Sequence, residues 1–411
     1  MSLFNKKIIL LSVISLFIFL FIIFIFISTT DTDIKIYYSY AQSILQNKVP
    51  YRDFFVVYPP FSLLPIILPG FFSTNITTYK NLFGLEMLTF LILTIFLLYL
   101  LSKRLKKDYF LVILGFLLIS IFLSYTIIKR FDIFVTFLIV LSTFLLVKKK
   151  YCLSGVLLIF GVFTKFYPII LFPLFFLYIF KKESVKKSLF FVFSSGVTFF
   201  IIVLFLFLIM PPQGSGLYSL EYQFTRPLHF ESFYGSTLLL LEKTKVPIFK
   251  TTLKNDMYGW SLYDSPLLKF ILPFSTLFIL IMFMLLFYSF EKKGEISDGS
   301  LLKYVFSFLL IFMTFNKVLS PQFLIWILPL GLLALNSKEF KILFLVVFLT
   351  FFIYPPLYGI LIEKQFFALS LLFLRNVLLV LLSFSFLRSL LSPSPKITKN
   401  KIPQKSSANT K

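Results

Sequence analysis

The feature that most constrains this chain is a series of long apolar stretches without charge. Residues 8–27, 82–101, 190–210 and 271–290 are examples, and each is about as long as the roughly 20 residues that a helix needs to cross a bilayer. Only 14% of the 411 residues are charged, whereas about a quarter are charged in an ordinary soluble domain. A soluble enzyme is therefore excluded, and we expect an all-α integral membrane protein.

Basic residues lie in clusters between the apolar stretches and set the expected topology. The chain has 40 Lys and Arg against 17 Asp and Glu, and short basic loops mark the cytoplasmic side of a membrane protein. Placing every cluster inside predicts a multi-pass cell-membrane protein with both termini cytoplasmic, and the charge then reports topology rather than binding of nucleic acid. The twelve expected spans are 8–28, 81–101, 109–127, 131–147, 151–163, 166–180, 188–210, 267–290, 301–316, 320–335, 340–358 and 366–388.

This topology leaves two long segments on the outer side, 29–80 and 211–266, where we expect short interfacial helices and the functional residues. The proline-rich segment 58–72 is expected to dip into the outer leaflet or lie along it, because counting it as a span would reverse the charge pattern. Residues 1–390 are expected to form one domain, followed by a basic, disordered cytoplasmic tail at 391–411.

Two carboxylates, Asp31 and Asp33, directly follow the first span. A carboxylate at the mouth of a membrane helix suits a general base, and a pair of them can hold a divalent ion, which the pattern permits but does not require. Alternatively, the two acids only end the helix and mark the water boundary. Because Cys152 and His229 are the only cysteine and histidine, a disulfide framework and a zinc–thiolate site are excluded.

The segment after these acids resembles a known enzyme group. Tyr37-Tyr38-x-Tyr40-Ala41, Pro50-Tyr51 and Tyr58-Pro59-Pro60 follow in that order. The arrangement resembles the first outer loop of the C-type glycosyltransferase superfamily, and in particular the family of polyprenyl-phosphate-mannose-dependent α-mannosyltransferases. Three later segments are similar to elements of the same family: 164–168, 225–232 and 319–329, the last with Phe323 in place of the usual tyrosine.

The resemblance implies a polytopic enzyme that takes a hexose, with mannose preferred, from a polyprenyl-phosphate donor and passes it to a lipid or glycan acceptor. Asp33 would be the general base and Asp31 its orienting neighbour or a second metal ligand, with no cofactor required. The resemblance also places Tyr58 and Gln322 among the substrate-binding residues.

Cations on the outer side point to the same chemistry, since a departing phosphate must be met by positive charge. The expected donor-binding residues are Lys129, Arg130, Lys165, Arg226, His229, Glu231 and Arg375. Each outer cation could instead be snorkelling to the interface. Arg375 lies within the last expected span and needs a partner, for which Glu86 and Glu363 are the structural candidates. The segment 232–245 is expected to form an interfacial helix beside a lipid groove.

Two other classes of protein remain open. A lipid or polyprenyl-sugar flippase would also have about twelve spans, but should gather its polar residues near the bilayer midplane. A non-catalytic membrane scaffold would need neither the acid pair nor the outer cations.

Overall fold

The computed structural model describes residues 3–209, 217–256, 259–294 and 296–392, so most of the tail expected at 391–411 lies outside the described residues. Within these residues, six helices are long and apolar enough to cross a membrane. A helix satisfies its backbone polar groups internally, which is why apolar segments adopt this form in hydrocarbon. The six are α1 (Leu3–Ile27), α4 (Ile76–Arg104), α10 (Val185–Ile209), α13 (Leu268–Lys292), α14 (Asp298–Phe315) and α18 (Phe366–Leu391).

The other expected spans also coincide with helices, but these helices are shorter. They have between 11 and 17 residues, so the number of crossings stays a prediction, while the multi-pass helical class is confirmed. They are α5 (Tyr109–Phe122), α7 (Asp132–Val147), α8 (Tyr151–Thr164), α9 (Phe172–Lys182), α15 (Leu324–Ala334) and α16 (Ser337–Ile353), with the 3₁₀ turns η2 (Tyr167–Leu171) and η5 (Pro321–Phe323) before α9 and α15.

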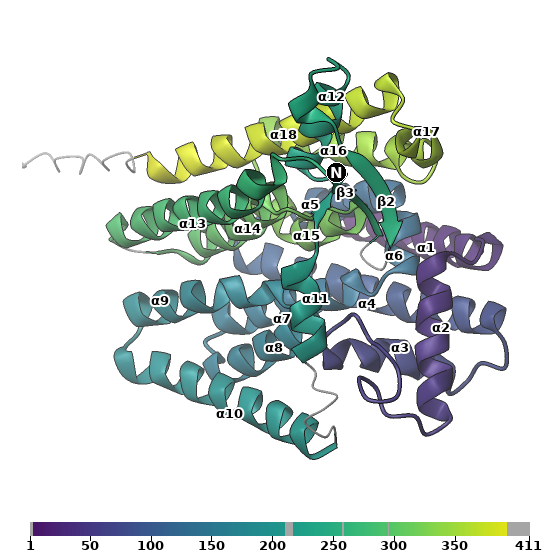
Figure 1. Ribbon diagram of the computed structural model, residues 1–411. Coiled ribbons are helices and arrows are strands. Elements are labelled where there is room, and N and C mark those ends of the chain that lie inside the picture. Colours follow the sequence, from purple (N-terminus) through teal and green to yellow (C-terminus); the bar gives the residue numbers. More distant parts are fainter. Residues whose placement is uncertain (1–2, 210–216, 257–258, 295, 393–411) are drawn as a thin grey trace, which may run out of the picture.

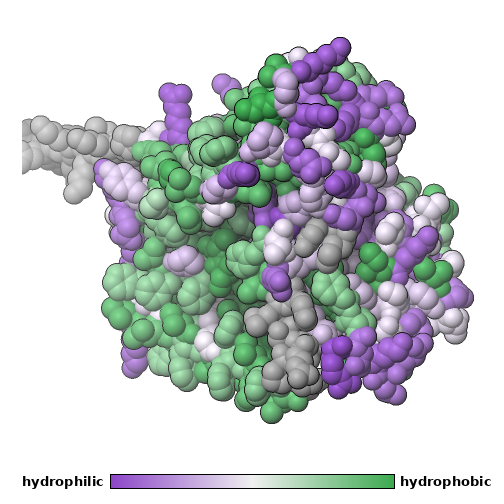
Figure 2. Space-filling view, in the orientation of Figure 1, coloured by the Kyte–Doolittle hydropathy of each residue, from purple (hydrophilic) through white to green (hydrophobic). Residues whose placement is uncertain are grey.

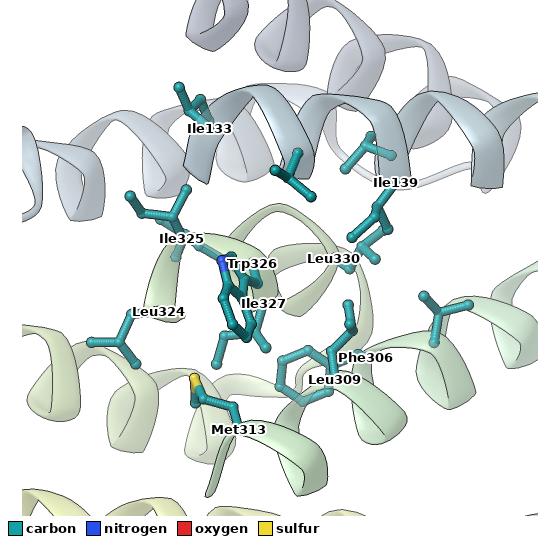
Figure 3. Close-up of a cluster of buried hydrophobic side chains, with 14 of the residues drawn as sticks. Ile133, Ile139, Phe306, Leu309, Met313, Leu324, Ile325, Trp326, Ile327 and Leu330 are labelled. Atoms are coloured by element: carbon teal, nitrogen blue, oxygen red, sulfur yellow. The ribbon is translucent and has the colours of Figure 1, made fainter. Parts of the chain in front are cut away.

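Helix α15 lies at the centre of the core. Figure 3 shows its apolar side chains between α7, which carries Ile133 and Ile139, and α14, which carries Phe306 and Leu309. Trp326 on α15 is only 3% exposed. This packing fixes the position of the beginning of α7, which carries part of the site described below.

One end of the bundle is basic. Ion pairs join Lys6 to Asp108, Arg104 and Lys182 to Asp298, and Lys181 to Glu291. These pairs bring together the ends of α1, α4, α9, α13 and α14, and Figure 1 shows the end of α18 on the same side. Basic residues at these helix ends thus gather at one end of the molecule, here called the basic end; the opposite end is called the site end. Figure 2 shows hydrophobic residues over α10 and α13, and a mixture of hydrophilic and hydrophobic residues over α12.

The site end is built from shorter elements. The proline-rich segment folds into η1 (Pro60–Ser62) and α3 (Leu63–Gly70) rather than a long helix. The second long segment was expected to carry short interfacial helices, and it also contains a three-stranded antiparallel sheet of order β1-β3-β2, which was not anticipated from the sequence. The elements at this end are α2 (Thr32–Leu45), α6 (Ser124–Lys129), α11 (Leu217–Thr225), α12 (Phe233–Glu242), η4 (Pro247–Phe249), α17 (Tyr358–Ile362), β1 (Leu228–His229), β2 (Thr252–Asp256) and β3 (Gly259–Tyr263).

Candidate functional site

Helix α2 places the two acids that follow α1. Asp31 is its N-cap, and its Oδ1 accepts a hydrogen bond from the backbone N–H of Ile34 at 3.0 Å, which satisfies one of the unpaired amides at a helix start. Ile34, Tyr37 and Ala41 are buried along one face of α2, so the helix is fixed to the bundle. Asp33 in the first turn therefore has a defined position, and its side chain keeps 28% of its surface exposed.

Arg130, at the junction of α6 and α7, binds both acids. Its Nη1 lies 2.7 Å from Asp31 Oδ2, and its Nη2 pairs with Asp33 Oδ2. Nη2 also donates to the hydroxyl of Tyr354 at 3.2 Å, and the hydroxyl of Tyr125 donates to Asp31 at 3.4 Å. One guanidinium can serve two carboxylates because its donors form a planar fork. We call these five residues the carboxylate cluster.

Burial and charge act on Asp33 in opposite directions. Burial raises the pKa of its carboxyl, Arg130 lowers it, and neighbouring Asp31 raises it again, with a net rise. A carboxylate with a raised pKa is a better proton acceptor near neutral pH. The geometry thus gives Asp33 the exposure and the basicity that a general base requires, whereas the Asp31 side chain is 13% exposed and holds the start of α2.

Two lysines fix the connection between α1 and α2. Lys129 is fully buried and its ammonium donates to the carbonyl of Thr29. Lys80 donates to the carbonyl of Ser28 at 2.6 Å. Both therefore bind the backbone directly before Asp31. In this structure the Lys129 ammonium binds this connection. Its expected role at the donor phosphate stays a prediction.

Tyr58 lies beside the carboxylate cluster. Its hydroxyl is 3.5 Å from that of Tyr37, and its ring meets Phe131 edge-on with centroids 4.9 Å apart. Burial raises the pKa of the Tyr58 hydroxyl, and Asp33 raises it further. Tyr58 is therefore a neutral hydroxyl close enough to Asp33 to sense its charge.

Lys165 forms a second buried ion pair behind this cluster. Its Nζ lies 2.6 Å from Asp132 Oδ1, which also accepts from the indole N–H of Trp326 at 2.7 Å. The lysine Nζ lies 5.1 Å from the ring centre of Phe131, a distance at which a cation is attracted by an aromatic ring. Burial lowers the pKa of Lys165, and Asp132 raises it in part. Gln322, on η5, accepts a hydrogen bond from Ser320 at 2.8 Å.

Glu231 and Arg375 meet in a separate buried group. Both side chains are 1% exposed, with Arg375 Nη1 3.9 Å from Glu231 Oε2. Arg375 Nη2 donates to the backbone carbonyl of Glu231 at 2.8 Å, and Asn376 donates to the same carbonyl at 3.1 Å. The expected structural partners of Arg375, Glu86 and Glu363, were thus wrong. The partner of Arg375 is instead Glu231, which belongs to the second long segment.

His229 and Arg226 lie on the same loop segment. The backbone N–H of His229 donates to the carbonyl of Lys317 at 3.0 Å, and its side chain is buried. Burial and the charge of Arg226 lower the pKa of His229 to about 3, so the ring is neutral at physiological pH. Arg226 lies 5.9 Å from the ring of Tyr222 on α11.

Two tyrosines connect the carboxylate cluster to the Glu231 group. The rings of Tyr354 and Tyr358 lie 5.1 Å apart, and Tyr358 also meets Phe230 edge-on. Burial raises the pKa of the Tyr358 hydroxyl, and so do Glu231 and Asp33. Tyr358 therefore lies within the electrostatic reach of both carboxylates, and the two groups form one continuous polar region.

A cavity of about 260 Å³ adjoins the carboxylate cluster. Tyr125 and Tyr354 form part of its wall, so a molecule inside it would approach Asp31 and Arg130. The rest of the lining is mostly apolar and includes Phe24, Phe122 and Phe351. The cavity is thus apolar with a polar end, the form of site that accepts an amphipathic molecule.

The acid pair is poorly suited to a resident metal ion. Both carboxylates are bound to Arg130, and among the described residues no group of three His, Cys, Asp or Glu could hold a metal. A divalent ion would have to displace a guanidinium that already neutralises its ligands. The two carboxylates are therefore arranged to act as side chains paired with Arg130.

Four of the site residues were not anticipated from the sequence. Tyr125, Tyr354 and Tyr358 carry no local motif, and only the fold brings them to the acids. Asp132 could have been found, because it is an acid at the start of an apolar span and lies two residues after Arg130.

Comparison with known proteins supports a class of protein for this arrangement, a polytopic membrane glycosyltransferase. Residues 55–245 match the model of glycosyltransferase family 87. The match covers less than half of the chain: it includes Tyr58, Arg130 and Glu231, but Asp31 and Asp33 precede it. No curated protein matches the chain.

Proposed function

We propose that this protein transfers a hexose, with mannose favoured, from a polyprenyl-phosphate donor to an acceptor hydroxyl at the outer face of the cell membrane. The observation that carries the proposal is the Asp33 side chain, which is partly exposed and paired with Arg130. It belongs to a cluster whose Tyr125 and Tyr354 line an apolar cavity. The family match supports the transferase class. The donor, the sugar and the topology with both termini in the cytoplasm rest on the sequence motifs and the distribution of basic residues.

The reaction is a single displacement. Asp33 accepts the proton of the acceptor hydroxyl as the oxygen attacks the anomeric carbon, and the bond from that carbon to the phosphate oxygen breaks, so the phosphate leaves with the electron pair. A phosphate leaving group needs no general acid of its own, unlike the leaving group of a glycoside hydrolase. The proton then passes from Asp33 to water.

The Arg130 geometry couples the two halves of this step. While Asp33 is ionised, it shares the guanidinium with Asp31. Protonation removes the charge of Asp33 and weakens its ion pair, so an N–H of Arg130 becomes available as negative charge develops on the departing phosphate. Electrostatic stabilisation then appears where the transition state requires it.

The test is transfer of labelled mannose from synthetic polyprenyl-phosphate mannose to a membrane extract by the purified full chain in detergent. We expect transfer by the wild type and roughly 10²–10⁴-fold slower transfer by Asp33→Asn. The matched control is Asp53→Asn, an exposed acid of the same loop that pairs with its neighbour Arg52 and accepts a hydrogen bond from the backbone N–H of Val49. Equal transfer by wild type and Asp33→Asn would exclude Asp33 as the base. Movement of the labelled lipid across liposomes without sugar transfer would favour the flippase alternative.

A further inference from the structure

A short basic loop projects from the site end after α12. It comprises residues 243–250, and its two ends are tied together. Glu242 Oε2 accepts hydrogen bonds from the hydroxyl of Thr251 at 2.9 Å and from the ammonium of Lys364 at 2.9 Å. Lys364 also donates to the backbone carbonyl of Thr251 at 3.0 Å. The basic loop therefore has a closed base and a defined position.

The basic loop carries three positive charges that no described acid neutralises. Lys243, Lys245 and Lys250 are exposed, and none of them forms an ion pair with a described residue. The acid at the base, Glu242, is already paired with Lys364. The next lysine, Lys254, pairs with Asp264 and is not part of this set.

Exposed apolar side chains lie between these lysines. Val246 and Ile248 are 45% and 46% exposed, and Pro247 between them begins η4. An exposed apolar pair flanked by unpaired cations is the pattern of a segment that enters a membrane interface. Figure 2 shows the same mixture over α12, where hydrophobic residues lie among hydrophilic ones.

The fold puts the base of the basic loop next to the first residues of α18, a candidate membrane span. Lys364 at its base lies two residues before α18, and the first residues of that helix, Phe366 and Phe367, are 66% and 64% exposed. Helix α12 packs along α18, with Asn376 donating to the hydroxyl of Ser236 at 2.8 Å. The loop thus extends beside the point where a candidate membrane span begins.

We propose that the basic loop is a membrane anchor that binds the headgroups of anionic phospholipids in the leaflet at the site end. The three lysines meet the lipid phosphates while Val246 and Ile248 enter the interface below them. Basic residues near an anionic surface are attracted to it over about a Debye length, and apolar contacts add to the binding. This inference does not depend on the transferase activity.

The experiment uses the full chain in nanodiscs, with a fluorophore that reports polarity attached at Ile248→Cys. The exposed native thiol is removed by Cys152→Ser. The discs contain phosphatidylcholine alone or with increasing phosphatidylglycerol. We expect the emission to shift to the blue as phosphatidylglycerol is added, and the shift to weaken with salt. Changing Lys243, Lys245 and Lys250 to Gln should remove most of the shift at every phosphatidylglycerol fraction, because each lysine strengthens the attraction to an anionic surface by roughly fivefold.

A matched control removes three exposed lysines near the basic end, Lys106, Lys148 and Lys150, by the same change to Gln. This variant should keep the wild-type shift. Emission that is independent of phosphatidylglycerol, or a response that survives loss of the three loop lysines, would overturn the proposal. So would a response to a soluble acidic polysaccharide in discs of phosphatidylcholine alone, which would identify a polyanion rather than lipid as the ligand.

Discussion

The guanidinium of Arg130 lies 2.7 Å from the carboxylate of Asp31, although the two residues are 99 positions apart in the sequence. Both side chains are largely buried, with 10% and 13% of their surface exposed. The same guanidinium also pairs with Asp33. The start of α2 is therefore held by one cation that comes from between α6 and α7, and this dependence can be tested.

Replacement of Arg130 by Met should destabilise the protein strongly. It leaves two carboxylates without their cation in a poorly solvated place, and removal of one partner from a buried pair costs about 3–5 kcal/mol. Arg130→Lys should recover part of the loss, because a lysine keeps the charge but cannot bind both acids with one planar group. Thermal unfolding in detergent measures both. Equal melting temperatures for the Met variant and the wild type would contradict the assigned role.

Substitutions of Asp31 should mainly lower stability, whereas substitution of Asp33 should mainly lower the rate of transfer. Asp31→Asn keeps an N-cap, since Asn caps as well as Asp, but it loses the ion pair with Arg130. Asp31→Ala loses the cap as well and should be about 1 kcal/mol less stable than Asp31→Asn. Asp33→Asn should fold normally and reduce transfer by roughly 10²–10⁴-fold, the usual contribution of a general base. Unfolding curves and transfer rates of the three variants separate the roles. A larger loss of transfer in Asp31→Asn than in Asp33→Asn would reverse the assignment.

The transfer rate should fall as the pH is lowered through the pKa of Asp33, because only the ionised carboxylate accepts a proton. Burial places that pKa above the ordinary value of 3.8, so the loss should begin at higher pH than for an exposed aspartate. A pH–rate profile at saturating donor measures it, and the apparent value belongs to the coupled pair of acids. Asp31→Asn should move the profile to lower pH, since it removes a charge that raises the pKa of Asp33. An unchanged pH–rate profile in Asp31→Asn would contradict the role of Asp33 as the general base.

The pair of Lys165 and Asp132 should show strong energetic coupling. Among the described residues, Lys165→Met leaves the indole of Trp326 as the remaining side-chain partner of the Asp132 carboxylate, which is 1% exposed. The change should cost about 3–5 kcal/mol. Adding Asp132→Asn removes the buried charge and should recover much of that loss. Melting temperatures of both single variants and the double variant complete the cycle. If the loss of stability in the double variant equalled the sum of the losses in the two single variants, the interaction between Lys165 and Asp132 would contribute little to stability.

The sequence predicted those features that depend on local pattern. Apolar length placed every expected span on a helix, and the position after α1 identified Asp31 and Asp33. The expected position of Arg130 on the outer side likewise predicted a cation at the site. Tyr354 could not be found in this way, because it reaches Arg130 across 224 positions of the chain and nothing local marks it. The sheet of β1, β2 and β3 was missed for a related reason: its strands have two to five residues, too few for a clear alternation.

Close packing of α8 against α10 gives a final prediction. A Cβ at Gly155 would lie 2.9 Å from the backbone carbonyl of Phe191 and would also collide with Ser195, and backbone cannot move away as a side chain can. Gly155→Ala should therefore force the helices apart and lower stability by about 1–3 kcal/mol, the usual range for overpacking. Gly196 on α10 is the matched control, because no atom lies within 4 Å of a Cβ built there. Gly196→Ala should be neutral or slightly stabilising, since Ala favours the helix over Gly. Melting temperatures in detergent compare the two, and similar values for both variants would show that α8 and α10 do not pack this closely in the folded protein.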